Sequence, residues 1–230
     1  MVHLVFLLAA TLAATSASPP VAPGPFELSV KGAGSRGTLV FTASGVAFAA
    51  ADPKKSRQWP YHELKQIRVV SPREIAFDTF EDGSRWRFGA DRTIEFDVTE
   101  GAVDGRLVAF LLEHIQRPVT SAVLPADIGE PRTRIDAKHL RGRKGTHGTI
   151  AVYTSGLSYE AGDPRASRYW RFGDLESVLR TSPFKLLVNV YERGDVRPFA
   201  FDLKAALPAD AFDYVWGQVN RPADRTGGAR

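Results

Sequence analysis

The chain has 230 residues, a formal net charge of +4 and no cysteine. The absence of cysteine excludes disulfide bonds, thiolate metal ligands and a lipid-modified cysteine, so packing must supply most of the stability. A hydrophobic content of 43% and a charged content of 24% are ordinary for globular proteins, and they exclude a polytopic membrane protein and a largely disordered chain.

The N-terminal segment has the pattern of an export signal. Residues 4–14 are almost wholly apolar, and small residues suited to cleavage follow at 15–17. We therefore expect a signal peptide over residues 1–17 and a Pro-rich spacer over residues 18–25, with the protein exported to the periplasm or outside the cell. Because no Lys or Arg precedes the apolar run, an uncleaved membrane anchor stays open as the alternative.

A first domain is predicted over residues 26–118, where apolar and polar residues alternate as in half-buried strands. Ala43-Ser44-Gly45 predicts a hairpin turn whose glycine can take a positive φ. The predicted strands are residues 26–31, 37–42, 46–50, 67–70, 75–80, 85–88 and 93–98, with a further strand opening at Trp59.

A second domain is predicted over residues 135–222, after a linker at residues 119–134 and before a disordered tail at 223–230. The linker contains two prolines and is short enough to favour a rigid tandem. Later strands of this domain are expected at residues 178–181, 185–191 and 198–203, with Trp170 opening the strand before them.

Both domains are expected to end in an amphipathic helix, because the apolar period changes from two residues to that of a helix. Arg117-Pro118 and Arg221-Pro222 are predicted to end these helices, since proline cannot continue one. The two apolar stripes are Leu107, Phe110, Leu111 and His114 in the first, and Phe212, Val215, Trp216 and Val219 in the second.

An internal repeat explains this shared plan. Residues 37–72 align without a gap to residues 148–183, and thirteen of the 36 pairs are identical. Self-similarity of this kind indicates that the two halves share one fold. The identical pairs include Asp52-Pro53 with Asp163-Pro164, Ser56-Arg57 with Ser167-Arg168, Trp59 with Trp170 and Ser71-Pro72 with Ser182-Pro183.

Two motifs occur in both halves of the chain. One is the G-T-L-x-x-T-x-x-G-V-x-F hairpin at residues 37–48, with a looser copy at 148–159. The other is an aromatic-x-E/D-L-x-x-I/V step at residues 61–67 and 172–178. These motifs resemble those of bacterial pleckstrin-homology-like (PH-like) and GRAM-type domains. The resemblance implies a mainly β fold with two tandem units, each a bent antiparallel sheet or partly open barrel capped by one C-terminal helix.

Members of this superfold bind lipid headgroups, peptides or other proteins and seldom catalyse reactions, so the resemblance implies a binding module. In some members, basic residues near the first hairpin hold phosphoinositides. The matching place in the second unit offers Lys138, Arg141, Arg143 and Lys144, our candidate anion-binding residues, whereas the first unit offers only Lys31 and Arg36.

These candidates belong to a wider basic segment. The first 118 residues hold 13 Lys and Arg against 13 Asp and Glu, whereas the remainder holds 17 against 13, so the whole net charge lies in the second half. A solvated linker and strand edge remains the simpler explanation of this charge. The segment contains Arg132, Arg134, Lys138, Arg141, Arg143 and Lys144, with His139 and His147 nearby.

The sequence contains no complete catalytic or cofactor-binding motif. His62-Glu63-Leu64-Lys65-Gln66 begins like a zinc-protease motif but lacks its second histidine. The nucleophile-elbow, P-loop and dinucleotide motifs do not occur. We therefore predict no enzymatic activity, no metal and no cofactor. We expect structural roles for several further residues. Glu63 and Asp174 should form turns or lie at strand edges, and Trp59 and Trp170 should pack in the cores. The histidines His114, His139 and His147 should lie at the surface or be partly buried.

Two functions follow as hypotheses. The first is a non-catalytic binding or scaffold protein of the bacterial cell envelope that engages a protein partner through two PH-like domains. The alternative is peripheral binding to an anionic lipid or polymer through the basic segment at residues 132–144. We expect no nucleic-acid partner.

Overall fold

The computed structural model describes residues 25–82, 91–142 and 144–221. The predicted signal peptide, most of the spacer, the strand expected at 85–88, Arg143 and the tail lie outside these residues. The described chain is mainly β with two helices, which confirms the predicted fold class.

The first unit is an antiparallel sheet followed by one helix. Within the described residues its strands lie in the order β5-β6-β7-β1-β2-β3-β4, and β4 does not pair with β5, so the sheet is open. The strands are β1 (Phe26–Gly32), β2 (Ser35–Thr42), β3 (Gly45–Ala50), β4 (Arg57–Pro60), β5 (Leu64–Ser71), β6 (Glu74–Asp82) and β7 (Asp91–Glu100), and the helix is α1 (Gly105–His114).

The second unit repeats this topology strand for strand. Its order is β13-β14-β15-β9-β10-β11-β12 among the described residues, and α2 follows. The elements are β9 (Thr133–Arg141), β10 (Lys144–Val152), β11 (Gly156–Ala161), β12 (Arg168–Arg171), β13 (Leu175–Ser182), β14 (Lys185–Glu192), β15 (Asp195–Leu203) and α2 (Ala209–Val219).

The identical Asp-Pro and Ser pairs of the repeat form the same turn twice. An aspartate side chain caps the short 3-10 helix after the third strand, and a serine hydroxyl accepts a hydrogen bond from the end of that strand. The bonds are Lys54 N–H to Asp52 Oδ1 (3.1 Å), Arg165 N–H to Asp163 Oδ1 (2.9 Å), Ala50 N–H to Ser56 Oγ (3.0 Å) and Ala161 N–H to Ser167 Oγ (2.9 Å).

The hairpin glycines have a different role from the one predicted. Neither Gly45 nor Gly156 has a positive φ; each is the first residue of a strand. A Cβ atom on Gly156 would lie 2.2 Å from the carbonyl oxygen of Trp170, and one on Gly45 would lie 2.4 Å from that of Trp59. Glycine is therefore needed because the neighbouring backbone approaches closely.

Each unit has its own hydrophobic core. Trp59 and Trp170 are buried in these cores, as predicted. Two details of the predicted helices are wrong. Trp216 is 52% exposed although its helical stripe was expected to face the core. Helix α1 ends at His114, before Arg117-Pro118, because Ile115 already has an extended backbone.

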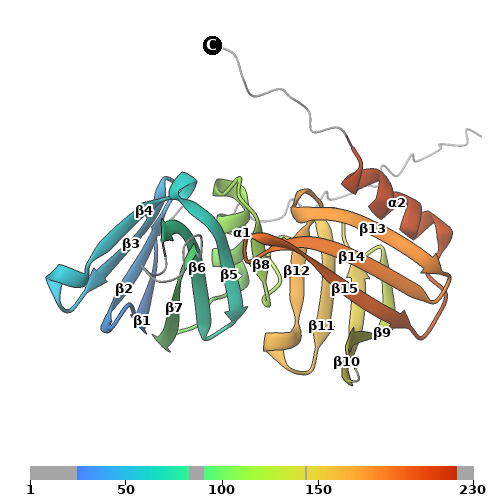
Figure 1. Ribbon diagram of the computed structural model, residues 1–230, viewed down its shortest axis with the longest axis horizontal. Helices are drawn as coiled ribbons and strands as arrows, with labels where there is room; N and C mark the ends of the chain where they lie inside the picture. Colours follow the sequence, from blue (N-terminus) through green and yellow to red (C-terminus); the bar gives the residue numbers. More distant parts are fainter. Residues whose placement is uncertain (1–24, 83–90, 143, 222–230) are drawn as a thin grey trace, which may run out of the picture.

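A short strand, β8 (Val119–Ser121), joins the two sheets into one. It lies parallel to β5 and pairs with β12 through Tyr169 and Ser121, so the described strands form a single 15-stranded sheet. Figure 1 shows the two units side by side, with β8 and α1 between them and α2 beside β13. The segment predicted as a linker thus contains a strand of the sheet.

Candidate anion-binding cleft

The predicted basic residues do not form one patch. On β9, alternate side chains face opposite sides of the sheet, so Arg141 lies on the same side as buried His139 and Lys138 lies on the other. The stem of Lys138 crosses Gly145, where a Cβ would meet its Cε at 2.5 Å. Lys144 is exposed opposite Arg141 in the β9–β10 pairing, and Arg143 lies outside the described residues.

Arg141 instead lines a cleft of about 560 Å³ at one end of the second unit. Cavities of this size hold small ligands or headgroups. The five arginines among the described lining residues come from separate parts of the fold, and Glu192 is the one carboxylate among them. The arginines are Arg141 at the end of β9, Arg165 before β12, Arg168 on β12, Arg193 after β14 and Arg197 on β15.

Arg168 lies deepest among these arginines. Its side chain is 13% exposed, and its Nε lies 3.6 Å from Glu192 Oε1, which is too long for a hydrogen bond. Its Nη1 donates to the carbonyl oxygens of Arg165 and Ser167, both at 2.7 Å. Burial lowers the pKa of Arg168 from its usual value, and Arg141 and Arg193 add to this effect, whereas Glu192 opposes it. The deep end of the cleft therefore holds more positive charge than Glu192 neutralises.

The first unit contributes to the cleft wall and holds two of the arginines. Val70 lines the cleft, and Glu74 Oε2 accepts a hydrogen bond of 2.8 Å from Arg165 Nη2. Gln66 Oε1 accepts from the backbone N–H of Arg193 at 2.6 Å. The turn at Arg193 has φ 60°, so this contact fixes an otherwise unfavourable backbone conformation. The cleft thus depends on the junction between the units.

His139 is buried at the cleft, which corrects the expectation that it lies at the surface or is partly buried. It is 4% exposed and stacks on Phe199 with ring centroids 5.1 Å apart. Burial, and then the charges of Arg141 and Arg168, lower its pKa to about 4. Its Nδ1 has no hydrogen-bond partner among the described atoms. A buried, neutral ring nitrogen is therefore left free at the cleft wall.

Part of this arrangement occurs in both units. In the first unit, Arg57 lies 3.4 Å and Arg92 lies 3.1 Å from the carboxylate of Glu81. In the second unit, Arg168 takes the place of Arg57, Arg197 that of Arg92 and Glu192 that of Glu81. In the first unit these side chains are 38–41% exposed. The second unit buries the equivalent carboxylate and adds Arg141, Arg165 and Arg193 around it.

Sequence reasoning found Arg141 and missed the other four arginines. They are separated by up to 56 positions, from Arg141 to Arg197, so no local motif connects them. The identity of Arg57 and Arg168 in the repeat was a signal, but it gave no indication of a charge cluster.

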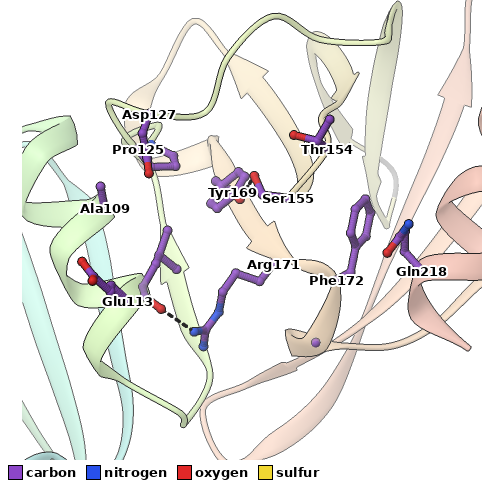
Figure 2. A pocket seen from close by; sticks show the side chains of 12 residues that line it. Ala109, Glu113, Pro125, Asp127, Thr154, Ser155, Tyr169, Arg171, Phe172 and Gln218 are labelled. Carbon is purple, nitrogen blue, oxygen red and sulfur yellow. Dashed lines mark hydrogen bonds between the residues drawn. The ribbon is translucent and has the colours of Figure 1, made fainter. Parts of the chain in front are cut away.

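A second cavity, of about 500 Å³, lies at the junction and is shown in Figure 2. Arg171 projects across it from β12 toward α1. Its guanidinium makes a bidentate ion pair with Asp174 at 2.9 and 3.0 Å. It also donates to the carbonyl oxygens of Leu112, Ile115 and Arg117 at 2.8–2.9 Å. These bonds occupy the guanidinium, so Arg171 fixes the junction rather than binding a ligand.

Asp174 lies in the short 3-10 turn directly before β13, as predicted, and it is also buried at the junction, which the sequence did not indicate. Its Oδ2 accepts from the backbone N–H of Val119 at 3.2 Å, and it is 4% exposed. Burial raises the pKa of Asp174 although Arg171 and the N–H of Val119 act to lower it. Its copy in the first unit, Glu63, is exposed.

Two searches of the described residues were negative. They hold no group of three or more histidine or carboxylate side chains placed to bind a metal. None of their helices is long and apolar enough to cross a membrane.

Comparison with known proteins identifies no family. No family model matches the chain, and no curated protein matches it. A solved structure, that of the Spt16D Pob3N heterodimer, matches over 81% of this chain and 98% of that chain, at 8% identity and a TM-score of 0.33. A TM-score this low carries no argument about fold or function.

Proposed function

We propose that the chain is a non-catalytic binding protein of the bacterial cell envelope, built from two PH-like units of the GRAM type, that holds an anionic group in the arginine cleft. The convergence of five arginines on one cleft with a single lining carboxylate is the observation that supports this proposal. Arginine is suited to the task because its planar fork of donors matches phosphate and carboxylate groups. The anionic group belongs to a lipid or a polymer.

A binding role fits the cleft better than catalysis. His139 is neutral and buried, and Glu192 is 4% exposed beside Arg168. The described side chains of the cleft therefore offer a strong field for an anion but no solvent-facing carboxylate or histidine to act as a general base.

The test measures cosedimentation of residues 18–230 with phosphatidylglycerol and phosphatidylcholine vesicles at low and high salt, beside calorimetry with soluble tripolyphosphate. We expect salt-sensitive binding to the anionic vesicles, because exposed charges are screened by salt. The double variant Arg141→Gln/Arg193→Gln should weaken binding at least tenfold, since a hydrogen bond to a charged group contributes about 1.5–3 kcal/mol.

The matched control is Lys138→Gln, which also removes one positive charge, but from the opposite face of β9. It should leave binding within about twofold. An equal loss in Lys138→Gln and Arg141→Gln would show general charge attraction and would refute the cleft as the site. Binding of tripolyphosphate without vesicle binding would assign the site to a soluble polyanion.

A protein partner remains the second candidate function. The observation that favours it is the group of large apolar side chains left exposed on the second unit, which includes Leu179, Phe184 and Trp216 at 48–52% exposure. Exposed apolar groups of this kind mark interaction surfaces when they lie together.

A further inference from the structure

Strand β13 is the copy of strand β5. Residues 64–71 align with residues 175–182 in the repeat. The pairing with the next strand confirms the equivalence, because both strands have register shifts at the same two places. These lie between Leu64 and Gln66 and between Val69 and Ser71 in β5, and between Leu175 and Ser177 and between Arg180 and Ser182 in β13.

The outer edge of β5 is filled by another segment of the chain. Strand β8 lies parallel to it, with Val119, Thr120 and Ser121 opposite Ile67, Arg68 and Val69. The N–H of Ala122 donates to the carbonyl oxygen of Val69 at 2.8 Å. The three residues of β8 are at most 3% exposed. The fold therefore contains a slot for one extended strand beside β5.

Among the described residues the same edge of β13 has no strand beside it, although α2 packs against β13. Strand β13 ends the sheet, and among the described residues its one neighbouring strand is β14. Leu179 is 48% exposed where its copy Arg68 is 4% exposed. On the adjacent helix, Trp216 is 52% exposed where Leu111, at the equivalent place in the stripe of α1, is fully buried. The second unit thus presents the slot without its strand.

We propose that the free edge of β13 binds an extended segment of a partner protein, parallel to β13, as β8 lies against β5. This is strand addition to a sheet edge, in which backbone hydrogen bonds give affinity and side chains give selectivity. It concerns a surface separate from the arginine cleft, and it rests on the second candidate function, a protein partner, for which it names the edge and the kind of segment that bind.

The residues along the slot indicate the chemistry of the segment. The repeat places its three central residues opposite Val178, Leu179 and Arg180. β-Branched or apolar residues suit the first two positions, as at Val119 and Thr120 in β8. An acidic residue suits the third, because Arg180 is exposed and lies over the Phe212 ring, with no carboxylate partner among the described residues.

The other possible occupants fit less well. A second copy has two free edges to offer. One is β4, which has four residues and includes Pro60, a residue that cannot donate a backbone hydrogen bond. The other is β13, but two β13 edges related by a twofold axis would pair antiparallel, unlike β8 and β5. The sequence after Arg221 begins Pro222-Ala223-Asp224, with no β-branched residue at the place of Val119 or Thr120. A partner segment is therefore favoured.

The probe is a synthetic peptide with the sequence of residues 117–124, in which the residue at position 121 is serine or glutamate. It is titrated into the isotope-labelled full chain and followed by amide chemical shifts and hydrogen exchange. We expect shifts and slowed exchange at Leu179 and Arg180, and at least threefold tighter binding of the Ser121→Glu peptide. A peptide with Thr120→Pro is the matched control and should not bind.

Arg180→Pro tests the edge directly. Because the carbonyl of Val69 faces β8, the N–H and C=O of its copy Arg180 face the open edge, so proline removes a donor there and leaves the β14 ladder intact. The Arg180→Pro chain, with an unchanged circular dichroism spectrum, should bind at least tenfold more weakly. Arg180→Ala should lose only the preference for the glutamate peptide, and Leu179→Asp, at an exposed position, gives a second variant that weakens binding.

Several results would overturn the proposal. One is the absence of shifts on β13 at millimolar peptide. Another is binding by a chain that stops at Arg221 but not by the full chain, which would assign the slot to residues 222–230. A concentration-dependent dimer in sedimentation that Arg180→Pro abolishes would assign it to a second copy. None of these results depends on anion binding, because the arginine cleft keeps its residues in every variant.

Discussion

At the scale of single residues, the buried side chain of His139 makes the stability of the folded chain depend on pH. Its pKa of about 4 lies below the value of about 6.5 for an unfolded histidine. As the pH falls from 6.5 toward 4, the unfolded chain therefore binds a proton that the folded chain does not, and stability falls over this window. The groups that face the ring are Arg141, Arg168 and Tyr159.

His139→Phe should remove this pH dependence. The phenyl ring keeps the stack on Phe199 and has no nitrogen to protonate or leave unpaired. Relative to the unsubstituted chain, the free energy of unfolding of the variant should rise by about 2–3 kcal/mol between pH 7 and pH 4. Urea unfolding at several pH values measures it, with His147→Gln, at an exposed position, as the control. A constant difference across this range would contradict a neutral His139.

At the scale of elements, the hairpins depend on close backbone approach. Gly156→Ala places a Cβ 2.2 Å from the Trp170 carbonyl oxygen, so β11 and β12 must move apart. We expect a loss of about 1–3 kcal/mol in the free energy of unfolding. Gly162→Ala is the matched control, since nothing lies within 4 Å of its added Cβ. Equal stability of the two variants in urea unfolding would show that the strands accommodate the methyl group.

The elements also show how much of the fold can be predicted from the sequence. Alternation of apolar residues is local, so most strands and both helices were placed by it, and the repeat reinforced them. The role of Gly45 was mistaken because close approach by Trp59 is a contact between strands, which spacing does not reveal. Pairing of β8 with β5 was missed because three residues are too short for a periodic signal. The helical period predicts burial of Trp216, but the described residues leave this side chain 52% exposed.

At the scale of the whole molecule, the junction makes the two units one body. Arg171 and Asp174 join β12 to the end of α1 and the start of β8. The candidate cleft also depends on the junction, because Gln66 and Glu74 of the first unit form hydrogen bonds with two of its arginines. Sequence reasoning could find neither, since each contact between the units spans more than 50 positions.

Arg171→Ala should lower the free energy of unfolding, because it removes contacts between the two units. It leaves Asp174 buried without its partner and three carbonyl oxygens of the α1 end without their donor. Breaking a buried pair in this way costs about 3–5 kcal/mol, and the value here should lie near the lower end because Arg171 is 22% exposed. The change is measured by urea unfolding with intrinsic tryptophan fluorescence.

The control is Arg106→Ala, which breaks an exposed pair with Asp104 and should cost less than about 1 kcal/mol. The two units should unfold together in the unsubstituted chain and in two separate transitions in Arg171→Ala. A single transition with unchanged midpoint in Arg171→Ala would mean that β8 alone holds the units together.

The position of β8 in the chain has a consequence for synthesis. Because it follows α1 after only four residues, the segment that covers β5 leaves the ribosome immediately after the first unit is complete and before any strand of the second. The exposed edge of the first sheet is thereby covered while the nascent chain is still growing, and an uncovered edge is the part of a sheet most prone to aggregate. A circular permutant that begins at Val119 would place β8 before the second unit and the first unit last, and would lose this order of events.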